Sequence, residues 1–284
     1  MNKQRYYEII PKKAIMENFD YMQLVRMEIS RKISNLLDEE KQKVFQLINF
    51  VGIGIDRLVD RNKKEKETFL KFADLMEKVW KGEKLCSKDD YESSAIELIS
   101  KLRKLKEKGF DQARYIFSDL QDLFCLQYQD VSRRWKILSL NDLQKIRIGT
   151  SKGMSAAYFY LLFPKLEKKD VEDVSLKCGL AVNTADDIID WYDDIQLGLI
   201  NIPKEEIENL HGVTIRNNRV KHVYKEELAL EIKYIKKEIK TIEHLYREAD
   251  KQLKKTVPKN IARGLLEDFM NSWLLECKEK YLLG

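Results

Sequence analysis

Two groups of aspartates at helical spacing are the residues of this chain best suited to do chemistry. Asp56 and Asp60 lie four residues apart, and Asp186, Asp190 and Asp194 repeat that spacing much later in the chain. Residues four apart share one face of a helix, so each segment is expected to project carboxylates from one side. Two such faces turned toward each other would surround hard divalent cations, above all Mg²⁺, with oxygen ligands. The pattern therefore predicts a metal site of the kind that holds a diphosphate.

The simpler alternative is that these carboxylates face water. The residues in the turns before each group argue against it, because they are mostly small or apolar. They are Ser175, Gly179, Val182 and Asn183 before the later group, and Phe45, Ile48, Asn49 and Gly52 before the earlier one. Buried carboxylates without partners are costly, and neighbouring ones raise each other's pKa. Bound metal removes both penalties, so we expect both faces to turn inward toward a cavity.

The composition excludes several other functions. The 52 basic and 47 acidic residues leave a net charge of only +5, and mixed charge is typical of solvated helix faces, so no nucleic-acid partner is expected. The four cysteines and three histidines follow no ligand spacing, which argues against a zinc site or a histidine-based triad. No apolar run approaches the ~20 residues that span a bilayer, and the first residues lack the apolar core of a secretion signal. We expect a cytoplasmic protein and leave contact with a membrane surface open.

The elements that must position these aspartates are predicted to be helices. The sequence has four prolines and none between Pro11 and Pro164, which favours long helices because proline breaks helix interiors. Apolar residues recur at spacings of three and four, and no alternating strand pattern stands out. The expectation is one all-α domain over residues 1–284. Its helices are expected at about 14–36, 40–61, 66–81, 88–108, 111–135, 140–163, 170–196, 204–210, 221–256 and 258–282.

A few residues are expected to mark helix ends. The stretch Ser87–Asp90 reads as an N-cap. Gly82 and Gly109 are expected just past C-termini. Pro258 suits the first turn of the last helix.

The segment Gly179–Pro203 resembles the second signature of the squalene/phytoene synthase family, which reads roughly L-G-x-A-x-Q-x-x-N-I-x-R-D-x-x-E-D-x-x-x-G-R-I-Y-x-P. Without gaps, the coinciding residues are Gly179, Ala181, Asp190, Asp194, Gly198, Ile200 and Pro203. Asp186 stands at the family's Asn and Asn183 at its Gln. Asp56–Asp60 resembles the first signature, D-D-x-x-D, and Gly149–Gly153 resembles the A-G-x-V-G segment between the two. The resemblance covers most of the chain in the right order.

This resemblance implies the class I terpenoid-synthase fold, a single helical bundle around a central cavity. In that fold the two aspartate motifs face each other across the cavity mouth, and two or three Mg²⁺ ions, or Mn²⁺, bridge them to a prenyl diphosphate. The implied metal ligands and catalytic carboxylates are Asp56, Asp60, Asp186, Asp190 and Asp194. The implied substrate-binding residues are Asn49, Lys152, Gly153 and Asn183. Lys152 is expected to reach the diphosphate, whereas Arg133, Arg134 and Arg147 are expected at least as readily to pair with nearby carboxylates.

The chain departs from the family at four positions. The Tyr and Arg that precede the family's first motif are here Asn49 and Ile53, and the Arg and Tyr of its second are Leu199 and Asn201. In the family these groups help to hold a second diphosphate. The resemblance therefore favours an enzyme that binds one farnesyl or geranylgeranyl diphosphate, ionises it, and cyclises or quenches the carbocation.

Two alternatives stay open. One is a head-to-head prenyltransferase that makes a squalene- or phytoene-like product. The other is a non-catalytic relative that acts as an assembly factor or lipid binder. The oligomeric state is not predicted.

Overall fold

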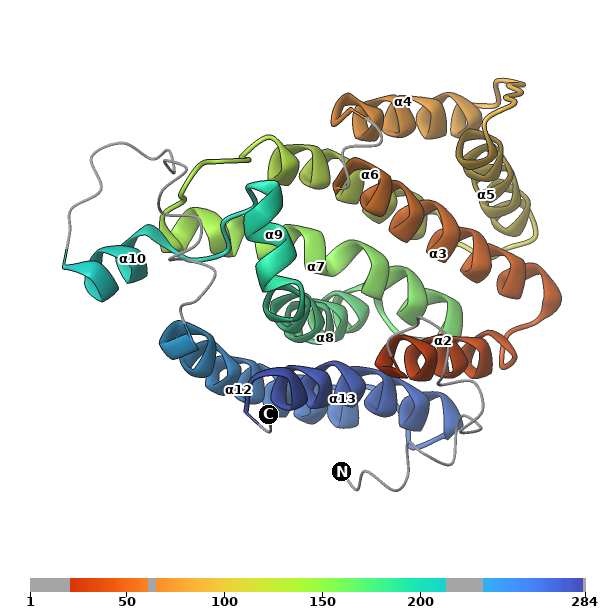
Figure 1. Ribbon diagram of the computed structural model, residues 1–284. Coiled ribbons are helices and arrows are strands. Elements are labelled where there is room, and N and C mark those ends of the chain that lie inside the picture. The colour runs from red at the N-terminus through yellow and green to blue at the C-terminus, as the bar shows by residue number, and fades with distance from the viewer. Residues whose placement is uncertain (1–20, 61–64, 213–231, 283–284) are drawn as a thin grey trace.

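The computed structural model describes residues 21–60, 65–212 and 232–282, without the side chains of residues 21, 56–58, 60 and 211. Within these ranges the chain is helical and contains no strand, which confirms the predicted all-α class (Figure 1). The helices are α2 (Tyr21–Ser34), α3 (Glu39–Asp60), α4 (Glu67–Lys81), α5 (Asp90–Glu107), α6 (Ala113–Val131), α7 (Leu140–Leu162), α8 (Lys168–Ile189), α9 (Trp191–Leu197), α10 (Lys204–His211), α12 (Ile232–Thr256) and α13 (Ile261–Tyr281).

Most predicted helix ends agree with the structure, and their caps explain why. The Asp89 side chain accepts hydrogen bonds from the backbone N–H groups of Tyr91 and Glu92 at the start of α5. Gly82 ends α4 at a φ of +104°, and Gly109 follows α5 at +93°, a backbone region in which a side chain would be strained.

Three predictions about helix ends are wrong. The helix expected over 111–135 ends at Val131. The last helix begins at Ile261 and not at Pro258, because Asn260 caps it by accepting a hydrogen bond from the Arg263 N–H at 2.9 Å. The single helix expected over 170–196 is two helices, α8 and α9, which meet at Asp190 with φ −90° and ψ 10°. The predicted helical segments at 14–20 and 221–231 lie outside the described residues.

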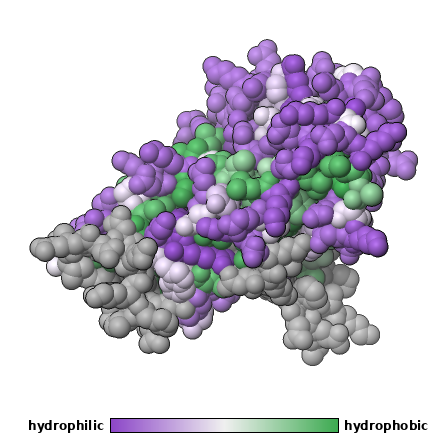
Figure 2. All heavy atoms as spheres, turned by 90° about the horizontal axis from the view of Figure 1, so that it is seen from above, coloured by the Kyte–Doolittle hydropathy of each residue, from purple (hydrophilic) through white to green (hydrophobic). Residues whose placement is uncertain are grey.

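Helix α8 lies at the centre of the bundle and packs against α7, α12 and α13 (Figure 1). Its closest approach to α7 depends on Gly179, because a Cβ atom there would stand 2.0 Å from the backbone oxygen of Ser151. Helices α12 and α13 form one side of the bundle with α2 beside α13, whereas α4 and α5 lie at the other extreme. Seen from above, apolar side chains gather in a band between polar surfaces (Figure 2).

Several helices bring their ends together at one pole of the bundle. Near the C-terminus of α13, the Cys277 thiol donates to the carbonyl of Ala185 in α8 at 3.2 Å, and the Lys280 ammonium donates to that of Ile189. Arg147, near the start of α7, reaches Asp187 near the end of α8. The aspartates predicted on α8 thus lie where four helices converge, since α2 joins α13 there through an ion pair between Arg26 and Glu276. Within the described ranges, no helix has the length and apolar character needed to span a membrane.

Candidate functional site

A cavity of about 1660 Å³ lies between α2, α3, α7, α8 and α13. Ligand pockets in proteins usually measure about 300–1,000 Å³, so this cavity has room for a long ligand. One part of its wall is aromatic. The rings that line it include Phe45, Phe50, Tyr158, Phe159, Phe269 and Trp273.

Carboxylates gather on the wall that α8 and α9 provide. Asp186, Asp190 and Asp194 all line the cavity, together with their neighbours Asp187 and Asp193. The change of helix at Asp190 does not separate them, because the Asp190 N–H still donates to the Asp186 carbonyl and the Asp194 N–H to the Asp190 carbonyl, each at 2.8 Å. All three aspartates therefore border the cavity, with Asp186 and Asp194 partly buried and Asp190 exposed, while their role as metal ligands stays a prediction.

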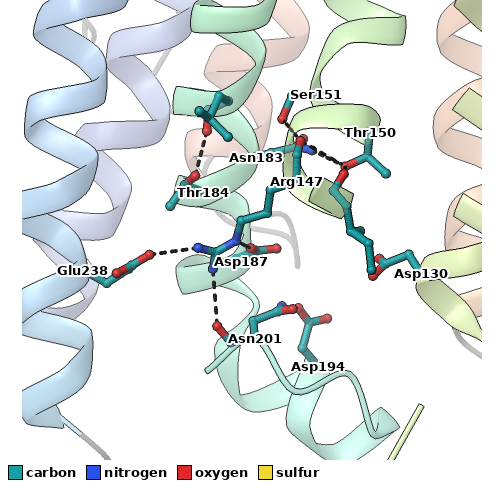
Figure 3. A network of polar contacts seen from close by, with 12 residues as sticks. Asp130, Arg147, Thr150, Ser151, Asn183, Thr184, Asp187, Asp194, Asn201 and Glu238 are labelled. Atoms are coloured by element: carbon teal, nitrogen blue, oxygen red, sulfur yellow. Dashed lines mark hydrogen bonds and ion pairs between the residues drawn. The ribbon is translucent and has the colours of Figure 1, made fainter. Parts of the chain in front are cut away.

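Asp187 is held by the buried guanidinium of Arg147 (Figure 3). Arg147 Nε donates to Asp187 Oδ2 at 2.8 Å, Nη1 donates to Glu238 Oε1 at 3.0 Å, and Nη2 donates to the carbonyl of Asn201 at 3.3 Å. Burial alone would lower the pKa of Arg147, but the charges of Asp187 and Glu238 outweigh it and raise that pKa. One guanidinium thus joins α7, α8, α12 and the segment after α9.

Asp194 is held by a second buried chain of contacts. The Asn201 side chain donates from Nδ2 to Asp194 Oδ2 at 2.9 Å and accepts on Oδ1 from Arg133 Nη2 at 2.6 Å. Arg133 also pairs with Asp130 and donates to the carbonyl of Ile200 at 2.9 Å. One oxygen of Asp194 is therefore already engaged inside the protein.

Sequence reasoning missed this role of Asn201 and treated the residue only as the loss of the family's tyrosine. A signal was present, because Asn201 is the single polar residue in the apolar run Leu199–Ile202. A lone polar side chain in a buried segment needs a hydrogen-bonding partner.

Asp186 differs from Asp187 and Asp194. It lines the cavity and has no hydrogen-bond or ion-pair partner among the described residues. Burial raises the pKa of Asp186 well above its usual value, and the negative charges of Asp190 and Asp187 raise it further, against a smaller opposing effect of Arg26. A cation bound beside Asp186 would relieve both penalties.

A metal fits the chemistry of this wall but is not held by the described residues alone. No three histidine, cysteine, aspartate or glutamate side chains within them are arranged to bind an ion. Asp186 and Asp190 are hard oxygen donors of the type that Mg²⁺ prefers, and they would need ligands from another element. The predicted partners are Asp56 and Asp60, whose side chains lie outside the described residues.

The backbone of α3 ends close to this wall. Arg134 Nη2 donates to the carbonyl of Val59 at 3.0 Å, in the last turn of α3. The preceding residue, Arg133, reaches the segment after α9 through Ile200 and Asn201. Two consecutive arginines after α6 therefore connect the turn that carries Asp60 to the network that holds Asp194.

The four predicted substrate-binding residues divide into two pairs. Asn49 and Asn183 line the cavity, and Asn183 Nδ2 donates to Thr150 Oγ1 at 3.0 Å. Lys152 and Gly153 lie on the side of α7 that faces α6 and α8 instead. Lys152 Nζ is 3.1 Å from Glu172 and 3.6 Å from Asp119, and a Cβ on Gly153 would stand 3.0 Å from the Asp119 carbonyl.

Lys152 does not line the cavity and pairs with carboxylates elsewhere, so the structure gives no support to the prediction that it reaches a diphosphate. The ion pairs with Asp119 and Glu172 hold the ammonium of Lys152 away from the cavity. Pairing with nearby carboxylates was the alternative prediction for the arginines. Arg133 and Arg147 do form such ion pairs, with Asp130 and Asp187.

No protein-family model matches the chain, and no curated protein matches it either. The candidate site therefore depends on the geometry of the chain itself and on the resemblance in its aspartate segments.

The cations that line the cavity already have partners within the described part of the chain. They are Arg26 with Glu276, Arg31 with Glu28, Arg133 with Asp130, Arg147 with Asp187, and Lys280 with the carbonyl of Ile189. A diphosphate would therefore not find a preformed cluster of unpaired lysines and arginines on this wall. Metal ions are the remaining means by which the carboxylates could hold such an anion.

Proposed function

We propose that the chain is a Mg²⁺-dependent enzyme that binds one C15 or C20 prenyl diphosphate, farnesyl or geranylgeranyl diphosphate, and ionises it. The observation that carries the proposal is the cavity of about 1660 Å³, which combines an aromatic wall with a pole of carboxylates where Asp186 has no partner among the described residues. The helices around this cavity would then adopt the class I terpenoid-synthase arrangement that the sequence resemblance implies.

The two parts of the cavity suit the two products of ionisation. When the C–O bond of the substrate breaks, its electron pair leaves with the diphosphate and an allylic cation remains. Mg²⁺ bound by Asp56, Asp60, Asp186 and Asp190 would neutralise the charge of the departing diphosphate. Asp194 would be positioned beside this site by its hydrogen bond from Asn201.

The aromatic wall would protect the allylic cation. Apolar rings exclude water, and their faces attract positive charge. The rings of Phe45 and Tyr158 pack with centroids 4.8 Å apart on this wall. Trp273 is a weaker candidate, because the Arg26 guanidinium already lies 3.8 Å from the centre of its ring.

A head-to-head prenyltransferase is the second candidate, favoured only by the size of the cavity. Against it, Leu199 and Ile53 stand where the family has arginines, both line the cavity, and neither can bind a second diphosphate. The mass of the product distinguishes the two reactions, since it contains either one prenyl chain or two. A non-catalytic lipid binder would bind the substrate without releasing diphosphate.

The test is release of diphosphate from farnesyl or geranylgeranyl diphosphate by the purified protein in the presence of Mg²⁺. We expect release with one of the two substrates, its loss when EDTA removes the metal, and its return when Mg²⁺ or Mn²⁺ is added back. A folded protein that releases no diphosphate from either substrate would contradict the proposal. Binding without release would indicate the non-catalytic alternative.

A further inference from the structure

One polar pair interrupts the aromatic wall of the cavity. The Tyr158 hydroxyl in α7 donates to Asn49 Oδ1 in α3 at 2.6 Å, and Asn49 Nδ2 donates to the carbonyl of Phe45 at 2.8 Å. Both side chains line the cavity, and the Tyr158 ring is fixed by its contact with Phe45. The pair is therefore positioned from both sides and oriented before any ligand binds.

The pair lies far from the carboxylates. Asn49 precedes Asp56 by seven residues in α3, which is about 10 Å along a helix, and Tyr158 follows Arg147 by eleven residues in α7, which is about 16 Å. Arg147 marks the carboxylate end of α7, because it contacts Asp187. The distances from Asp56 to Asn49 and from Arg147 to Tyr158 therefore both lead away from the carboxylates, toward the opposite end of the cavity. A group bound at Asn49 and Tyr158 would meet the hydrocarbon part of a substrate and not its diphosphate.

The unused hydrogen-bonding capacity of the pair includes the Tyr158 oxygen as an acceptor and one amide N–H of Asn49 as a donor. Tyr158 has given its only proton to Asn49, so its oxygen can only accept further bonds, and Asn49 keeps one N–H of its amide. Burial raises the pKa of Tyr158 well above its usual value, so the phenol keeps its proton at neutral pH. A water molecule, which donates and accepts, complements this pair.

Water can reach the pair from the adjacent surface. Phe50 and Ile53, which follow Asn49 within about one turn of α3, line the cavity and are 46% and 41% exposed. The cavity is thus open to solvent next to the polar pair, at Phe50 and Ile53.

We propose that Asn49 and Tyr158 hold a water molecule that quenches the carbocation, so that the product is an alcohol. The inference rests on the proposed function and specifies the chemical class of its product. A lone pair of the water oxygen forms a C–O bond to the cationic carbon, and the resulting oxonium loses one proton to bulk water through the opening at Phe50 and Ile53. Overall, one prenyl diphosphate and one water give one alcohol and one diphosphate, with no oxidant or reductant.

The test is product analysis with farnesyl or geranylgeranyl diphosphate, whichever the protein turns over, and Mg²⁺ in ¹⁸O-labelled water. The wild-type protein should give an alcohol that carries ¹⁸O. In Tyr158→Phe, which keeps the ring and its contact with Phe45, the molar ratio of alcohol to released diphosphate should fall about tenfold, because a held water loses one hydrogen bond. Asn49→Leu should lower the same ratio, which guards against an effect peculiar to one variant.

Tyr160→Phe is the matched control on the same helix. Tyr160 is buried outside the cavity, stacks on Tyr115, and its hydroxyl has no partner within the described residues, so this variant should keep the wild-type ratio. Release of diphosphate with only hydrocarbon products, or an unchanged ratio in Tyr158→Phe, would overturn the inference and leave the proposed function standing. Absence of diphosphate release from both substrates would contradict both.

Discussion

Two groups of carboxylates lie on opposite sides of α7, and they differ in how their charge is balanced. The acidic pole faces the cavity and consists of Asp186, Asp187, Asp190 and Asp194. The outer cluster lies between α6, α7 and α8 and consists of Asp119, Glu172 and Lys152. In the outer cluster one ammonium lies within 3.1 Å of Glu172 and 3.6 Å of Asp119, and none of the three residues lines the cavity.

The comparison separates charges that are paired within the fold from the charges that we propose to bind a metal. In the acidic pole, Arg147 balances Asp187 and Asn201 holds Asp194, but Asp186 is left facing the cavity without either. A buried, uncompensated carboxylate destabilises the folded chain unless a ligand compensates it. That unbalanced charge distinguishes the pole from the outer cluster and is the basis for assigning a metal to it.

The largest effect on stability is expected from removing the guanidinium inside the pole. Arg147→Met leaves Asp187 and Glu238 buried without their cation, so the free energy of unfolding should fall by about 3–5 kcal/mol in urea titrations. Lys145→Ala, an exposed site on the same helix, should cost less than about 0.5 kcal/mol. Equal losses in the two variants would show that Arg147 is not bound as described.

A smaller effect is expected from the pH dependence of the outer cluster. Burial raises the pKa of Asp119 from 3.8 to about 6, and the opposing effect of Lys152 is weaker. Between about pH 4 and 6 the folded chain then holds a proton that the unfolded chain has lost. The contribution of Asp119 to the free energy of unfolding should therefore decrease by about 2 kcal/mol as pH rises from 4 to 7.

The measurement for this prediction is the difference between wild type and Asp119→Asn. Asparagine does not titrate, so the difference in unfolding free energy between the two proteins should change with pH in that window and level off above it. A difference that stays constant from pH 4 to 7 would refute the raised pKa.

The smallest effect is expected from the lysine that the sequence had assigned to the substrate. Lys152→Met removes the cation from Asp119 and Glu172, but the Lys152 and Glu172 side chains are about one-third exposed, so the loss of stability should be about 1 kcal/mol or less. Diphosphate release should stay within about twofold of wild type. A loss of diphosphate release as large as that caused by changing a cavity residue would show that Lys152 does contribute to the substrate site.

How far the sequence predicted the structure depends on the kind of information each residue carries. Periodicity and caps predicted the helices well, because Asp89, Gly82 and Gly109 act within a few residues of themselves. The position of Asp186, Asp190 and Asp194 along one cavity wall was also predictable, since small and apolar residues precede them at helical spacing, although Asp190 is exposed.

The contacts between helices were not predictable in the same way. Lys152 was assigned to the cavity because its segment resembles a family motif, but the direction of its side chain is decided by Asp119 and Glu172, which are distant in sequence. The partners of Arg147 and Asn201 likewise come from four separate segments. Only the packing of α7 between α6 and α8 reveals which face of that helix meets the cavity.

The most direct test of the central claim compares Asp186→Asn with Asp119→Asn in Mg²⁺-dependent diphosphate release. Both changes neutralise one buried aspartate beside α7 with nearly the same shape. We predict that Asp186→Asn lowers the rate about 100-fold or more, because a charge that would stabilise the departing diphosphate through the metal is lost. Asp119→Asn should remain within about twofold of wild type. Equal rates in the two variants, or a greater loss in Asp119→Asn, would contradict the assignment of the acidic pole as the active site.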